Sequence, residues 1–133
     1  MESLKAPFGA LVLAAAFVSA APGAAQIISY RYDGAYIGAA NLERSLSDAS
    51  CTPTLPLVRL EIRNGILRAY EENGRQIVKG FVTGDGFFTS DYIFDDGRTT
   101  LFEGMVNARG RLTGGIVDGA CAWVVELSKL RRD

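Results

Sequence analysis

Side chains suited to catalysis are few in this sequence of 133 residues. It contains no His, which excludes a Ser-His-Asp triad, a Cys-His pair and a His-ligated metal site. The two cysteines, Cys51 and Cys121, are too far apart in the chain for the short ligand spacings of zinc sites. A catalytic thiol needs a basic partner, and the sequence offers no obvious one. We therefore predict that Cys51 and Cys121 form one structural disulfide.

Adjacent carboxylates occur at Glu71–Glu72 and at Asp95–Asp96. Neighbouring residues of a strand point to opposite faces, so neither pair can converge on a substrate. Acidic and amide residues are typical of hairpin turns, and we interpret both pairs as turn residues. The acidic residues match neither an EF-hand loop nor a calcium-binding repeat. The sequence therefore predicts no catalytic residue, no metal and no cofactor.

The charge of the chain is nearly balanced, with 14 Lys and Arg against 15 Asp and Glu, a formal net charge of -1. A protein that neutralises many phosphates needs a basic surface, so we predict no nucleic-acid partner. The arginines are scattered among acidic residues, which is typical of a solvated surface.

The segments that must position these side chains have the pattern of short strands. Leu57–Arg63 alternates apolar and charged residues, and Asn64-Gly65, the strongest short hairpin signal, follows it. Similar turn residues, each including Gly, divide the rest of the chain at 73–74, 84–86, 95–97, 108–110 and 118–119. No stretch has a sustained helical period. We predict an all-β fold, an antiparallel meander of about eight strands that closes as a small barrel or a two-sheet sandwich.

The turn at Asn73-Gly74 decides which side chains of the next strand face solvent. A two-residue turn places Tyr70, Ile77 and Phe81 together on the outer face, where they would form a contact surface. A three-residue loop sends Ile77 and Phe81 inward. The sequence leaves both possibilities open.

Aromatic side chains supply the candidate contact residues. Trp123 lies two positions after Cys121, and we favour core packing beside the disulfide over a ligand contact for it. The residues that we consider for contact with a ligand or partner are Tyr70, Phe81, Tyr92 and Trp123.

The first 25 residues have the features of a secretory signal peptide. Phe8–Ala21 is an uncharged and mostly apolar run, too short for a membrane-spanning helix. Small residues allow cleavage after Ala20 or after Ala25, and we favour the second, which makes Gln26 the first mature residue. We therefore predict a signal peptide over 1–25, a single β domain over 26–133, a secreted or periplasmic location, and no membrane insertion after cleavage.

A resemblance to a known group rests on Tyr32-Asp33-Gly34-Ala35-Tyr36-Ile37-Gly38, on the Cys51 loop, on the Asn-Gly and Asp-Gly turns, and on the last strand with Cys121. These features resemble a group of small exported bacterial β proteins of unknown function. In that group, a Tyr-Asp-Gly-x-Tyr-x-Gly start precedes a cysteine loop and a meander that ends in a second cysteine. The resemblance covers most of the chain after the signal peptide. It implies an exported β domain and assigns no catalytic or binding residue.

Three functions agree with these features. The first, which we favour, is an exported, non-enzymatic binding or protein-interaction module, which predicts an exposed apolar patch and no deep pocket. The alternative is a carrier of a small hydrophobic ligand, with a cavity lined by Phe88, Tyr92, Phe102 and Trp123. The third is a hydrolase or isomerase, which needs two ionisable groups that converge in a cleft. The partner is thus an unknown protein or a small ligand.

Overall fold

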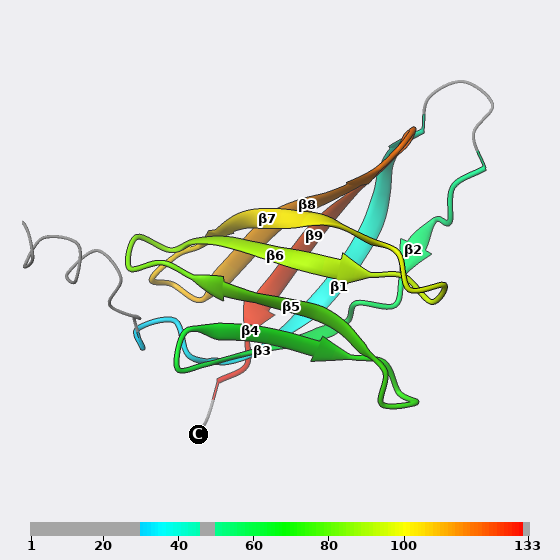
Figure 1. Ribbon diagram of the computed structural model, residues 1–133. Coiled ribbons are helices and arrows are strands. Elements are labelled where there is room, and N and C mark those ends of the chain that lie inside the picture. The colour runs from blue at the N-terminus through cyan, green and yellow to red at the C-terminus, as the bar shows by residue number, and fades with distance from the viewer. Residues whose placement is uncertain (1–29, 46–49, 132–133) are drawn as a thin grey trace, which may run out of the picture.

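The computed structural model describes residues 30–45 and 50–131, so the predicted signal peptide lies outside the described residues. The described chain is built of strands (Figure 1). They are β1 (Gly34–Ser45), β2 (Thr54–Leu55), β3 (Arg59–Arg63), β4 (Ile66–Tyr70), β5 (Gln76–Val82), β6 (Phe87–Ile93), β7 (Thr99–Val106), β8 (Arg111–Asp118) and β9 (Cys121–Lys129). The predicted all-β meander is confirmed.

The meander closes on itself as a barrel. Strands β3 to β9 pair in chain order, all antiparallel, and β1 pairs with both β3 and β9. The seam between β1 and β9 runs from Tyr36 to Ser45 and from Lys129 to Cys121, and Figure 1 shows the two strands side by side. The short strand β2 pairs only with β1 and lies outside the ring of eight. Of the two predicted closures, the barrel is therefore the one that forms.

The hairpin turns follow from their glycines. Asn64 and Gly65 both have positive φ, 55° and 78°, as a two-residue turn of type I′ requires. Four longer turns share another pattern, in which the third loop residue is a glycine with positive φ. These glycines are Gly74, Gly86, Gly97 and Gly110. A type I turn followed by such a glycine is the common three-residue hairpin loop.

The three-residue loop before β5 would put Lys79 inside the barrel, and a bulge prevents this. The register shifts between Ala69 and Tyr70, so that Ala69 pairs with Val78 and Tyr70 with Gln76. Ile77 is the extra residue, and both Ile77 and Val78 are buried. Lys79 and Phe81 then face solvent. The structure thus combines the two alternatives, with Ile77 inside as a three-residue loop requires and Phe81 outside as a two-residue turn requires.

The interior of the barrel is filled by side chains. Tyr36, Phe102, Leu112 and Ile116 are 0% exposed. The rings of Phe88 and Phe102 pack edge to face with their centroids 4.9 Å apart. A hollow large enough for water or a ligand would leave exposed surface on the residues around it, so these side chains pack against one another without such a hollow.

Two tyrosines cover the end of the barrel where β1 begins. The Tyr36 hydroxyl donates a hydrogen bond to the backbone carbonyl of Tyr32, with an O–O distance of 2.6 Å. The Tyr32 hydroxyl donates to the carbonyl of Gly84 in the β5–β6 turn, at 3.3 Å. Both side chains are buried, so this end of the barrel is closed as well.

Two buried tyrosines make the stability of the barrel sensitive to alkaline pH. Burial raises the pKa of Tyr36 to about 12, and the nearby Asp33 carboxylate adds to the rise. Burial also raises the pKa of Tyr92 to about 12, and the Glu71 carboxylate adds to it. Because the folded protein holds these protons more tightly than the unfolded chain, their contribution is complete below pH 10.0 and is lost towards pH 12.

We therefore expect the free energy of unfolding to fall by about 2 kcal/mol for each of these tyrosines over that range. Denaturant titrations at a series of alkaline pH values measure this fall, and near-ultraviolet absorbance reports tyrosinate. The variants Tyr36→Phe and Tyr92→Phe should each reduce the slope. An unchanged slope in both variants would contradict the assignment.

Candidate functional site

The four aromatic contact candidates separate into two groups. Tyr70 on β4 and Phe81 on β5 are exposed on the outside of the barrel. Tyr92 and Trp123 are buried in the core, where the Tyr92 ring packs against Phe94 with centroids 5.0 Å apart. The favoured interpretation of Trp123 as a core residue beside the disulfide agrees with this placement. Of the four candidates, Tyr70 and Phe81 are therefore the exposed ones, whereas Tyr92 and Trp123 contribute only to the lining of a depression at the disulfide end.

The predicted disulfide is present at the far end of the barrel. Cys51 and Cys121 are bonded, with a Cα–Cα distance of 5.8 Å. The bond joins the loop after β1 to the first residue of β9, which are the two ends of the meander. The Trp123 indole N–H donates to the Thr52 carbonyl at 2.8 Å and holds the same loop. This end therefore has a structural role.

Ionisable side chains also meet at the disulfide end, in a depression of about 360 Å³. Arg75 forms an ion pair with Glu71 at 2.9 Å and donates to the backbone carbonyls of Ile93 and Phe94. Arg75 thereby connects the β4–β5 turn to the end of β6. The Glu71 carboxylate is committed to this connection.

The second arginine at this end, Arg98, connects the β6–β7 turn to the end of β8. It contacts Asp96 at 2.8 Å and Asp118 at 3.0 Å. The hydrogen bond from Arg98 lowers the pKa of the Asp96 carboxyl. The predicted role of Glu71 and Asp96 as turn residues agrees with these contacts, and the carboxylates are bound by arginines rather than presented to a substrate.

The exposed aromatic side chain of Phe81 belongs to a larger feature, which we name the outer apolar strip. It consists of Ile66, Phe81, Phe87 and Met105, on four successive strands, β4 to β7. Ile66 pairs directly with Phe81, and Phe87 with Met105. Phe81 and Phe87 are diagonal neighbours, since Phe81 pairs with Thr89. Phe81 is 59% and Phe87 56% exposed.

A shallow hollow of about 540 Å³ adjoins the outer apolar strip at Phe87 and Met105. Its floor includes Gly104 of β7 and Gly114 of β8, which pair directly with each other. An apolar strip beside a hollow can accept a protruding side chain of a partner. Sequence reasoning identified Phe81 here but missed Phe87 and Met105, because their alignment depends on the β6–β7 register.

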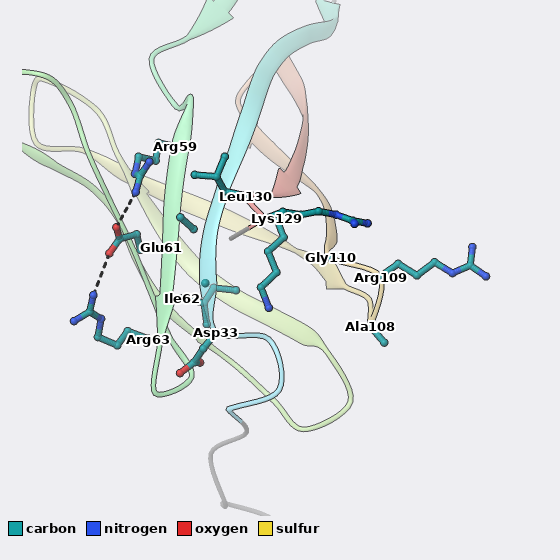
Figure 2. Close-up of a pocket in the computed structure, with 13 residues that line it drawn as sticks. Asp33, Arg59, Glu61, Ile62, Arg63, Ala108, Arg109, Gly110, Lys129 and Leu130 are labelled. Atoms are coloured by element: carbon teal, nitrogen blue, oxygen red, sulfur yellow. Dashed lines mark hydrogen bonds and ion pairs between the residues drawn. The ribbon is translucent and has the colours of Figure 1, made fainter. Parts of the chain in front are cut away.

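A second concave surface, of about 880 Å³, lies across the start of β1, and we name it the basic groove. Its cationic side chains are Arg59, Arg63, Arg109, Lys129 and Arg131. Figure 2 shows the row of Arg59, Glu61 and Arg63 from β3 on one side, and Lys129 from the end of β9 on the other. Of these residues, Arg59, Arg63 and Arg109 belong to the arginines that we predicted from the sequence to be scattered surface charges.

In the part of the chain that the structure describes, no three His, Cys, Asp or Glu residues are grouped as a metal site would require. Within residues 30–45 and 50–131, no helix has the length and hydropathy needed to cross a membrane. Comparisons with protein-family models, curated proteins and solved structures found no match. The resemblance to small exported β proteins therefore stays a prediction.

Proposed function

We propose that this protein is an exported, non-enzymatic binding module that contacts a partner protein through the outer apolar strip. The observation that carries the proposal is the contrast between a filled interior and exposed aromatic rings outside. Phe102 is 0% exposed in the core, whereas Phe81 is 59% exposed on the surface. Exposed apolar side chains that are contiguous on a folded protein mark contact surfaces.

Export and rigidity support the same proposal. The predicted signal peptide would deliver the chain to an oxidising compartment, where a disulfide such as Cys51–Cys121 persists. The disulfide and the closed barrel keep the four strands of the strip in a fixed arrangement. A preorganised surface loses less conformational entropy when it binds.

The two other functions receive less support. A carrier of a small hydrophobic ligand needs interior space, but the side chains predicted to line its cavity are all buried in the packed core. These are Phe88, Tyr92, Phe102 and Trp123. An enzyme needs ionisable groups that converge on a substrate, whereas the carboxylates of Glu71 and Asp118 each form an ion pair with an arginine.

The test is capture of a partner from the exported fraction of the native cell, with the purified protein immobilised. The double variant Phe81→Ser/Phe87→Ser should lose at least about 30-fold in affinity for the protein that the wild type retains stoichiometrically, as expected when aromatic hot spots are removed. The matched control is Val58→Ser/Val117→Ser, which alters two exposed apolar residues away from the strip.

The control variant should retain the partner like the wild type. Equal retention by the strip variant would contradict the role of the outer apolar strip. A stoichiometric hydrophobic small molecule that copurifies with the wild type, without a protein partner, would favour the carrier instead.

A further inference from the structure

Cationic side chains outnumber carboxylates among the residues that line the basic groove. Glu61 is its central carboxylate and is already shared by Arg59 at 3.3 Å and Arg63 at 3.8 Å. The Asp33 carboxylate accepts hydrogen bonds from the backbone N–H groups of Asn64 and Gly65, so it caps the β3–β4 turn. The two acidic side chains that line the groove are therefore engaged.

The cations on the opposite side have no such partners within the ranges that the structure describes, 30–45 and 50–131. Among the described residues, no carboxylate forms an ion pair with Arg109 or Lys129. The Lys129 side chain lies over Gly34, at the start of β1, where a Cβ would collide with it. The absence of a side chain at Gly34 thus leaves the groove open at this point. Both sides of the groove present positive charge that a bound anion would complement.

We propose that the basic groove binds an acidic segment of the same partner protein, an inference that rests on the proposed function. Continuity supports a single partner, because Arg63 of the groove pairs directly with Ile66 of the outer apolar strip across the β3–β4 hairpin. A partner seated on the strip would reach the groove without a gap. Arginine binds carboxylates in a bidentate manner, which adds specificity to the charge attraction.

The width of the groove favours a peptide over a small anion. Strands β3 and β9 pair with opposite edges of β1, so their backbones are about 10 Å apart. A single carboxylate or phosphate engages only some of the cationic side chains on the two sides. An extended acidic segment presents several carboxylates, because its side chains on one face repeat about every 7 Å.

Other polyanions fit the groove less well. None of the described residues that line it is aromatic, so it offers no stacking surface for the bases of a single-stranded nucleic acid. A flat lipid surface cannot reach a concave floor formed by Gly34 and Ala35. The acidic segment of a protein is therefore the ligand class that matches both charge and shape.

The probe is a short fluorescent peptide in which Glu alternates with Thr, and fluorescence anisotropy measures its binding to the wild-type protein. We expect saturable binding that weakens as salt is added. Arg63→Gln and Lys129→Gln, one on each side of the groove, should each reduce the affinity by about tenfold. The matched controls are Arg68→Gln and Lys79→Gln, which remove the same charge from exposed residues outside the groove, and these should bind like the wild type.

Four outcomes would overturn the inference. They are absence of binding, equal loss in the control variants, saturable binding of the matching Gln-Thr peptide, and binding of tripolyphosphate or anionic vesicles in place of the acidic peptide. The strip variant Phe81→Ser/Phe87→Ser keeps the groove intact and should bind the acidic peptide normally. The peptide assay therefore tests the inference about the groove alone. Partner capture with the strip variant tests the proposed function.

Discussion

The double variant Cys51→Ser/Cys121→Ser is expected to lose about 4 kcal/mol of unfolding free energy, because it removes a cross-link that restricts the unfolded chain. The bridged residues are 70 positions apart, and the entropy lost on closing a loop grows with its length. Chemical denaturation of the oxidised wild type and of the variant measures the difference. Such a loss is a large part of the stability of a domain of this size.

Reduction of the wild type provides the control for this prediction. Dithiothreitol should lower the stability of the wild type to that of the double variant and should leave the variant unchanged. A double variant as stable as the oxidised wild type would mean that hydrogen bonds between β1 and β9, together with the Trp123–Thr52 contact, hold the barrel closed without the disulfide.

Gly38→Ala is the second substitution with a large expected effect, since it disturbs the seam of the barrel. A Cβ at Gly38 would overlap the backbone carbonyl oxygen of Glu126 and approach the Cα of Leu127 to 2.9 Å. Backbone atoms of a paired strand cannot rotate away, so β1 and β9 must separate. We expect a loss of about 3 kcal/mol in unfolding free energy, at the upper end of the usual cost of overpacking.

Gly115→Ala is the matched control for Gly38→Ala. The added Cβ would lie 3.7 Å from the carbonyl oxygen of Trp123, an ordinary contact. Its effect should stay within about 0.5 kcal/mol. Thermal and denaturant unfolding of both variants measure the two effects. Equal stability of the two would contradict the close approach of β1 and β9 at Gly38.

Much of the fold could be predicted from local patterns. The alternation in Leu57–Arg63 and the Asn64-Gly65 turn determine the first hairpin, in which Glu61 pairs with Arg68 and Ile62 with Leu67 as a two-residue turn requires. The two cysteines, placed near the ends of the meander, predicted the bond that joins them. These features depend on residues close in the chain or on a single possible pairing.

The orientation of β5 could not be predicted in the same way. It depends on a loop of three residues and on a bulge at Ile77, whose effects on the alternation cancel at Phe81. The bulge keeps Lys79 out of the core, and the cost of burying that charge explains why this register is preferred. The combined effect of the loop and the bulge can be recognised only when it is known which side chains of β5 face the core and which face solvent.

The basic groove illustrates a second limit of sequence reasoning. Arg63 and Lys129 lie far apart in the chain and come together only because β1 pairs with both β3 and β9. Their alignment is therefore a consequence of barrel closure rather than of any local motif. The burial of Tyr92 has a related cause, because the β6 register directs it inward.

Native mass spectrometry of the protein purified from the exported fraction measures leader cleavage, disulfide formation and interior ligand content in one experiment. We expect a chain that begins at Gln26, is lighter than the reduced form by two hydrogens, and carries no hydrophobic small molecule in its interior. A chain with both thiols free, a retained leader, or a stoichiometric hydrophobic ligand held inside the barrel would contradict this expectation.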